Sequence, residues 1–154
     1  MTPSQARNAI KRSLKALIDP KPTPQQKSLI WEYFQNQCAY CGCPLKRSER
    51  KAHIDHLIAE SEGGSNQLCN LILTCPVCNG DEKREHAWQA FLLEKCGDDH
   101  STYQARHDRI SQWQSEQCGS ATLTPEQQAL LGEAFDSVND SFTSAVKQLS
   151  QSRS

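Results

Sequence analysis

The sequence predicts an α+β fold in which a short β-hairpin and a helix are tied together by two cysteine pairs and flanked by α-helices at both ends. Apolar runs at 52–59 and 70–74 are typical of short strands. Pairs of cysteines stand before the first run and after the second. Apolar residues that recur every three or four positions near both termini predict the flanking helices.

Length and composition indicate one domain of ordinary size with helical additions. The chain has 154 residues, 36% of them hydrophobic, and contains no run of about 18 apolar residues that could cross a bilayer. Its first residues lack the separate apolar region and cleavage site of a secretory signal. We therefore expect a cytoplasmic protein without a membrane segment.

Charge is distributed unevenly along the chain. Residues 1–51 hold ten Lys and Arg against three Asp and Glu, whereas the remainder holds seven against fifteen. A polyanionic partner should therefore approach the first third of the chain. Solvated helices without a partner would explain the same distribution.

Two helices are expected before the first cysteine pair. Residues 4–18 combine an apolar face with a basic stripe, with Ser4 as the expected N-cap, and the proline-rich segment 19–24 ends this helix. A second helix starts at the Thr23 cap with proline at its first position. Its expected buried face is Leu29, Ile30, Tyr33 and Phe34.

The two strand-like runs predict a hairpin with a long loop, because Gly63 and Gly64 between them are a turn signal. A helix should follow the second cysteine pair and end at Gly97. Another is expected over 101–118, ended by Gly119. The expected buried residues of these two helices are Trp88, Phe91 and Leu92, then Tyr103, Ile110 and Trp113.

The last helix is expected to start at the Thr124 cap. Its apolar stripe would pack on its own domain or serve a dimer, so the chain is expected to be a monomer or a homodimer. The stripe consists of Leu131, Phe135, Val138, Phe142, Ala145 and Leu149. The expected domains are a basic helix with linker at 1–22, the core at 23–96 and a helical extension at 97–154.

Cysteine spacing indicates a structural metal site. The cytosol keeps thiols reduced, so eight cysteines without a secretory signal favour metal over disulfides. A gap of two residues within each pair lets both sulfurs turn toward one ion, and tetrahedral Zn(II) is the natural occupant. The expected ligands are Cys38, Cys41, Cys75 and Cys78. We interpret Cys43, Cys69, Cys96 and Cys118 as small buried hydrophobes or loose thiols, with Cys43 as a substitute ligand in a minor alternative.

The order of residues between and after the cysteine pairs resembles the HNH nucleases. Asp-His at 55–56, a Gly-Gly turn, Asn-Leu at 70–71 and Cys-x-x-Cys-Asn at 75–79 follow one another. Asn70 follows His56 by 14 positions, and Asn79 follows Asn70 by nine. The resemblance spans roughly residues 38–85 and implies a ββα-metal core, a hairpin and a helix that hold one divalent ion.

The resemblance implies a metal-dependent DNA endonuclease with His56 as general base, Asp55 and Asn79 as ligands of the ion, and Asn70 as a structural residue. The chemistry agrees, because carboxylate and amide oxygens suit Mg(II) or Mn(II). Phosphate contacts by basic residues carry no sequence information, so we expect weak sequence preference. The expected backbone contacts are Arg7, Lys11, Arg12, Lys15, Lys46, Arg47, Arg50 and Lys51.

Two further residues have less settled roles. His53 lies on the same strand face as Asp55, where it would touch the ion's water shell or a phosphate, or would have no role. Lys83 stands where some relatives have a metal-binding histidine. A protonated lysine cannot bind the ion, so we expect it to contact phosphate.

Two other classes of protein remain open on this sequence. A zinc-stapled nucleic-acid-binding module without catalysis would need the cysteine pairs but not Asp55, His56 and Asn79 together. A scaffold protein that acts through its C-terminal helix would self-associate without either metal.

Overall fold

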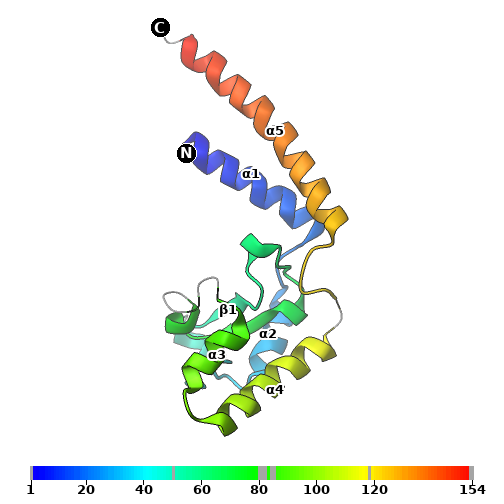
Figure 1. Ribbon diagram of the computed structural model, residues 1–154. Helices are drawn as coiled ribbons and strands as arrows, with labels where there is room; N and C mark the ends of the chain where they lie inside the picture. Colours follow the sequence, from blue (N-terminus) through cyan, green and yellow to red (C-terminus); the bar gives the residue numbers. More distant parts are fainter. Residues whose placement is uncertain (1, 50, 80–82, 84–85, 118, 153–154) are drawn as a thin grey trace. The chain divides into compact units, whose positions relative to one another are not determined.

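The computed structural model describes residues 2–49, 51–79, 83, 86–117 and 119–152. Two strands and the helices around them confirm the α+β class (Figure 1). Contacts divide the chain into two compact units, one of residues 22–122 and one of residues 1–21 and 123–154. The functional division at 1–22, 23–96 and 97–154 stays a prediction.

The larger unit is built on the expected hairpin. Strands β1 (His53–His56) and β2 (Leu71–Thr74) pair antiparallel, with His53 opposite Thr74 and His56 opposite Leu71. All four residues of β2 are buried, as its continuous apolar run requires, whereas β1 begins at an exposed residue. Side chains at 55 and 56 therefore leave opposite faces of a strand that reaches the surface.

Helices α2 (Pro24–Tyr33), α3 (Trp88–Cys96) and α4 (His100–Glu116) surround the hairpin. Short 3₁₀ turns lie at Arg47–Glu49, Glu60–Glu62 and Leu68–Asn70. The predicted cap of α2 is confirmed, because Thr23 and Gln26 exchange side-chain and backbone hydrogen bonds. Gly97 ends α3 as predicted, but α4 ends at Glu116, before the predicted terminator Gly119.

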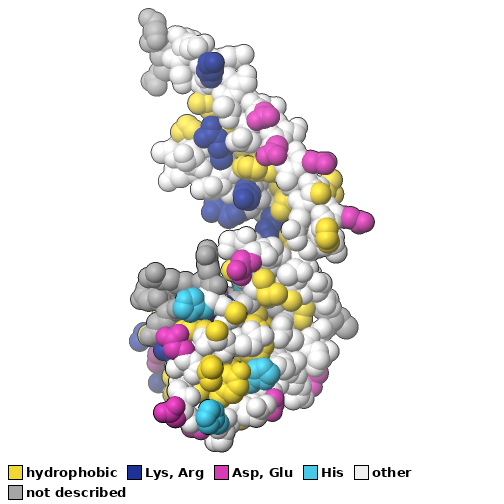
Figure 2. Space-filling model, in the orientation of Figure 1, with side chains coloured by type: hydrophobic (Ala, Val, Ile, Leu, Met, Phe, Trp, Pro, Cys, Tyr) yellow, Lys and Arg dark blue, Asp and Glu magenta, His cyan; other side chains and the backbone are white. Residues whose placement is uncertain are grey.

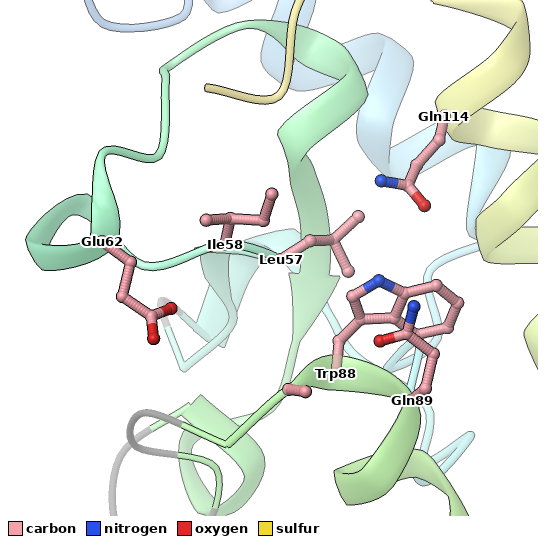
Figure 3. Close-up of a pocket in the computed structure, with 7 residues that line it drawn as sticks. Leu57, Ile58, Glu62, Trp88, Gln89 and Gln114 are labelled. Atoms are coloured by element: carbon pink, nitrogen blue, oxygen red, sulfur yellow. The ribbon is translucent and has the colours of Figure 1, made fainter. Parts of the chain in front are cut away.

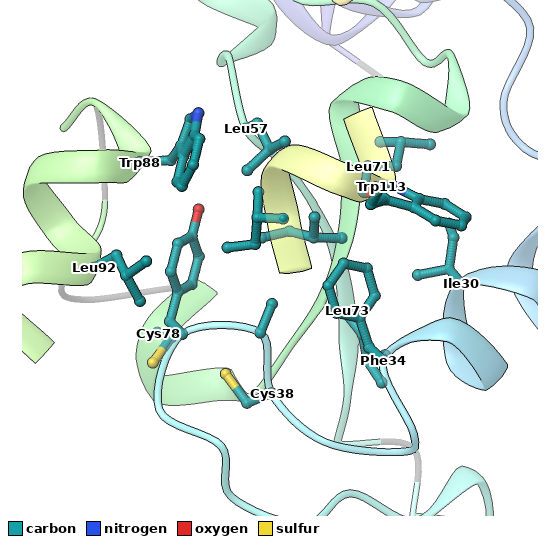
Figure 4. Close-up of a cluster of buried hydrophobic side chains, with 14 of the residues drawn as sticks. Ile30, Phe34, Cys38, Leu57, Leu71, Leu73, Cys78, Trp88, Leu92 and Trp113 are labelled. Carbon is teal, nitrogen blue, oxygen red and sulfur yellow. The ribbon is translucent and has the colours of Figure 1, made fainter. Parts of the chain in front are cut away.

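One hydrophobic core joins β2 to these three helices (Figure 4). Ile30 and Phe34 of the α2 segment are buried as predicted, whereas Leu29 is 50% exposed, so its predicted burial is wrong. Leu29 directly precedes Ile30, and neighbouring helix residues point about 100° apart, so the two cannot share one narrow buried face. The indole N–H of Trp113 donates to the carbonyls of Leu68 and Leu71 and fixes α4 against the start of β2.

The smaller unit pairs helices α1 (Pro3–Ile18) and α5 (Pro125–Gln151), which lie side by side (Figure 1). Arg7 lies over the Phe142 ring and donates to the Thr143 hydroxyl at 3.2 Å, and Lys11 lies over the Phe135 ring. Figure 2 shows Lys and Arg side chains gathered over α1 and Asp and Glu side chains along α5. Neither helix buries any residue fully, so amphipathic side chains and aromatic rings form most of this contact.

The predicted cap of the last helix is confirmed, and that of the first is wrong. Thr124 and Gln127 form a capping box. At the N-terminus Thr2, not Ser4, is the cap of α1: its hydroxyl accepts from the Gln5 amide at 3.3 Å. The physical reason is Pro3, which is favourable at the first helical position and so moves the cap to the residue before it. In the described part of the chain, no helix is long and apolar enough to span a membrane.

Replacing Leu73 by alanine should destabilise the larger unit. Leu73 is fully buried in β2, so Leu73→Ala should lower the free energy of unfolding by about 2–5 kcal/mol through lost burial and the cavity left behind. Urea denaturation followed by tryptophan fluorescence measures this unit, because it contains Trp31, Trp88 and Trp113. Leu93→Ala is the matched control, since Leu93 is 48% exposed on α3. Equal losses in the two variants would contradict this core.

Candidate functional site

A cluster of four cysteines lies beside the hairpin. The sulfurs of Cys38, Cys41, Cys43 and Cys75 all lie within 4.8 Å of one another, and those of Cys41 and Cys75 are 3.7 Å apart. Tetrahedral zinc with Zn–S bonds near 2.3 Å places its sulfurs about 3.8 Å apart. These four cysteines could therefore bind zinc, and the predicted sulfur-rich metal site has a matching geometry.

Cys43 belongs to this group of four, whereas Cys78 lies at its edge. The Cys78 thiol hydrogen-bonds Cys38, and its backbone N–H donates to the Cys75 sulfur at 3.5 Å. Sequence reasoning named Cys78 as a ligand and Cys43 as its substitute, because only the first belongs to a Cys-x-x-Cys pair. The fold brings five thiols together, and four suffice for one zinc ion.

The electrostatics of the cluster favour one thiolate at Cys38. The hydrogen bond from the Cys78 thiol, helped by backbone amides, lowers the pKa of Cys38 to about 4 despite its burial. Burial raises the pKa of Cys43 to about 12 and also raises the pKa of Cys41. Metal binding must therefore displace protons from the neighbouring thiols, which is the usual price of a thiolate site.

Arg106 of α4 supports the first cysteine pair. Its guanidinium donates to the carbonyl of Tyr40 at 2.7 Å and to that of Cys41 at 3.0 Å. Gly42 leaves room for this contact, because a Cβ there would lie 2.4 Å from the Arg106 Nη2 atom. Arg106 thus fixes the loop that carries Cys38 and Cys41. Sequence reasoning missed it, because nothing in its local pattern marks an arginine that reaches a distant loop.

Asp55 and His56 lie at the end of β1, and Lys83 approaches both. The Asp55 carboxylate accepts from the Lys83 Nζ atom at 3.1 Å, and the same ammonium donates to the His56 carbonyl. Lys83 is only 3% exposed. Lys83 is not helical and α3 begins only at Trp88, so the prediction of one helix from the second cysteine pair to Gly97, with Lys83 and Asn79 on the same face, is wrong. The Lys83 side chain instead turns back to the end of β1.

The His56 ring is held by Asn66 from the hairpin loop. Its Nε2 atom lies 3.0 Å from the Asn66 Oδ1 atom. An amide oxygen only accepts hydrogen bonds, so in this arrangement Nε2 carries the hydrogen and Nδ1 keeps its lone pair. Sequence reasoning missed Asn66, since a polar residue after a Gly-Gly turn is ordinary loop composition.

Asn70 closes the hairpin loop from inside. It is fully buried, its side-chain oxygen accepts from the Ile58 amide at 2.8 Å, and its amide group donates to the carbonyls of Ile58 and Ser65. Gly64 permits the tight loop, because a Cβ there would lie 1.9 Å from the Ile58 carbonyl oxygen. Asn70 therefore contacts the loop that carries Asn66, while Asn66 itself contacts His56.

The other two candidate residues are Asn79, which directly follows Cys78, and His53, which begins β1. Asn79 is half-buried in a helical turn over 76–79, and its backbone N–H donates to the Cys75 carbonyl at 3.0 Å. This turn attaches Asn79 directly to the sulfur cluster. His53 is exposed at the start of β1, where its carbonyl accepts from the Thr74 hydroxyl at 3.3 Å.

A hollow of about 450 Å³ adjoins the end of β1. Leu57 and Ile58 line it from the chain that follows His56, Trp88 and Gln89 from α3, and Gln114 from α4 (Figure 3). Glu62 adds a carboxylate to its lining, and the described lining residues include no lysine or arginine.

The expected DNA-contacting residues fall into both units. Arg7, Lys11, Arg12 and Lys15 belong to α1 of the smaller unit, where Arg12 is exposed and Arg7 and Lys11 contact aromatic rings. In the larger unit, Lys46 and Lys51 pair with Glu49, and Arg47 lies over the Trp31 ring. The predicted Arg50 lies outside the described residues. Most of these side chains thus have a partner within the protein.

Comparison with protein families matches residues 38–85 to the HNH endonuclease family. The match includes both cysteine pairs, the hairpin and the candidate residues from His53 to Lys83, and it confirms the predicted resemblance. Both terminal helices lie outside it. A search of curated proteins gave no match. The matched domain indicates a nuclease-type function and makes a nucleic acid a reasonable partner.

Removing Cys75 and Cys78 together should abolish zinc binding. The double variant Cys75→Ala/Cys78→Ala leaves only three of the five clustered thiols, so we expect it to lose the one equivalent of zinc that the parent protein should retain after dialysis. Elemental analysis of the purified proteins measures it. Cys69→Ala is the matched control, because Cys69 is buried outside the group.

Zinc retained in full by Cys75→Ala/Cys78→Ala would refute this site. The paired variants Cys43→Ala and Cys78→Ala, analysed alongside, identify the fourth ligand as the one whose removal releases zinc.

Proposed function

We propose that the protein is a metal-dependent endonuclease that hydrolyses DNA phosphodiester bonds with low sequence preference. One observation carries the proposal: within the segment that matches the HNH family, Asp55 and His56 lie together at the end of β1, and Asn66 holds the His56 ring. A protein that only folds around zinc has no need of an oriented imidazole at the residue that directly follows a carboxylate.

His56 acts as the general base in this proposal. Hydrolysis needs a water molecule that loses its proton as it attacks phosphorus. The hydrogen bond to Asn66 fixes the ring and leaves Nδ1 as the proton acceptor. Asn70 contributes indirectly, because it closes the loop from which Asn66 reaches the ring.

Asp55 and Asn79 are the proposed ligands of one Mg(II) or Mn(II) ion. Their oxygen donors fit such a hard ion, and Asp55 is partly buried at a strand end, where a charged carboxylate needs a cation. When bound, the ion would supply stabilisation of charge on the phosphate. His53 and Lys83 are proposed to contact the ion's water shell or a phosphate.

Structural zinc is the second proposed metal. Cys38, Cys41 and Cys75 would hold it, with Cys78 or Cys43 as the fourth ligand. Such an ion ties the chain before the hairpin to the chain after it, so it fixes Asn79 relative to β1. We propose that the site works only with this scaffold in place.

DNA is the proposed substrate, bound mainly through its phosphates. Arginine and lysine side chains contact phosphate without reading base edges, which accounts for the low sequence preference. Exposed basic residues of both units, Arg12, Lys46, Arg47 and Lys51 among them, are the proposed contacts.

A second candidate function is a zinc-stapled nucleic-acid-binding module without catalysis. The Lys83 contact favours it specifically, because an ammonium already compensates the Asp55 charge. The endonuclease needs the His56 imidazole for cleavage, whereas the binding module has no catalytic use for it.

Replacing His56 by alanine should abolish cleavage. Loss of a general base costs on the order of 100-fold or more in rate, whereas zinc content and DNA affinity should stay unchanged. Conversion of supercoiled plasmid to open-circular or linear DNA, with Mg(II), Mn(II) or EDTA, measures activity. His100→Ala, at the exposed start of α4, is the matched control. Plasmid that stays intact with the zinc-loaded parent protein in every metal would favour the binding module.

DNA affinity should depend strongly on salt. Lowering the salt concentration from about 200 to 50 mM should strengthen binding, because each neutralised phosphate releases a counterion. Arg12→Gln should remove one phosphate contact and so reduce the slope of log affinity against log salt concentration by about 1. Fluorescence anisotropy with a labelled duplex in Ca(II) measures both. Lys147→Gln on α5 should leave the slope unchanged, and a salt-independent affinity would contradict phosphate-led binding.

A further inference from the structure

Lys83 is a buried lysine at the centre of the candidate site. Among the described residues, its ammonium has three neighbours: the Asp55 carboxylate at 3.1 Å, the His56 carbonyl, and the face of the Tyr40 ring, whose centroid lies 5.9 Å away. The Lys83 side chain is only 4% exposed, and that of Asp55 is 18% exposed. Water therefore does little to solvate this pair.

These three neighbours form a binding site for one positive charge. A buried ammonium is stable only when paired and hydrogen-bonded, and this one has an anion, a carbonyl dipole and an aromatic face. Tyr40 belongs to the loop between Cys38 and Cys41, so the cation site spans that loop and the end of β1.

We propose that Lys83 is the resident cation of this site and competes with the divalent ion for Asp55. This inference rests on the proposed function, because it takes Asp55 as a ligand of that ion. Two cations on one partly buried carboxylate repel each other. Binding of the ion therefore requires the Lys83 ammonium to leave the Asp55 oxygen.

Competition of this kind couples metal binding to DNA binding. A lysine that leaves Asp55 loses its anion, and a backbone phosphate is the anion that an incoming substrate provides. DNA therefore stabilises the form in which Asp55 is free, and DNA and the ion each raise the affinity for the other. Without DNA, the Lys83 ammonium neutralises the Asp55 carboxylate. When DNA binds, Lys83 moves to a phosphate and Asp55 becomes available to the divalent ion.

The affinity of the zinc-loaded protein for Mn(II) tests this proposal. All variants are made in a His56→Ala parent, so that DNA added in the second measurement is not cut. Electron paramagnetic resonance of free Mn(II) is the readout. We expect Lys83→Met in this parent to bind Mn(II) at least tenfold more tightly. Lys27→Met is the matched control, because Lys27 is an exposed lysine of α2 in the same unit, and the Mn(II) affinity of this variant should not change. Unchanged or weaker Mn(II) binding by Lys83→Met would overturn the competition.

A short DNA duplex provides a second measurement, which needs no Lys83 variant to fold. Duplex should raise the Mn(II) affinity of the parent at least tenfold, after subtraction of binding to DNA alone, and an absent effect would overturn the coupling. Asp55→Asn should weaken Mn(II) binding both in the His56→Ala parent and in the Lys83→Met variant of that parent. If Asp55→Asn has no effect, Asp55 is not a ligand and the proposed function fails as well. If it does weaken binding but Lys83→Met changes nothing, only the competition is wrong.

Discussion

The convergence of five thiols at the base of the hairpin is the constraint on which the larger unit depends. Cys38, Cys41 and Cys43 come from the loop after α2, whereas Cys75 and Cys78 come from the turn after β2. A two-stranded hairpin is marginal in water by itself. The sulfur cluster holds its two flanking segments together, and the aromatic and aliphatic core between β2 and the helices completes the fold.

Hydrogen bonds and one cation–π contact link the sulfur cluster to the candidate catalytic residues. Arg106 fixes the first cysteine loop, Tyr40 of that loop faces Lys83, and Lys83 reaches Asp55. On the other side of β1, Asn70 shapes the loop and Asn66 reaches His56. The Asp55 carboxylate and the His56 imidazole thus have different side-chain partners, Lys83 and Asn66, which suits two groups that are proposed to do different tasks. Lys83 also donates to the His56 backbone carbonyl and so links the two residues.

Features with a local signal could be predicted from the sequence, and features made by long-range contacts could not. The caps at Thr23 and Thr124, the two strands and the cysteine pairs each depend on a few neighbouring residues. Asn66, Arg106 and the contact between Lys83 and Asp55 depend on where the folded chain returns to itself, and no short pattern encodes that. The sequence favours Cys78 over Cys43 as a ligand, because only Cys78 belongs to a Cys-x-x-Cys pair. In the folded chain the Cys43 sulfur lies within 4.8 Å of those of Cys38, Cys41 and Cys75, which sequence spacing does not indicate.

The sequence segments that make up the two units also set an order of folding. Residues 22–122 are continuous in sequence, so the larger unit can form as soon as that stretch has left the ribosome. The smaller unit instead joins the two ends of the chain, and α1 has no partner until residues 125–151 have been made. During synthesis the basic face of α1 therefore stays uncovered until α5 has been made, because Arg7 and Lys11 lack their phenylalanine partners until then.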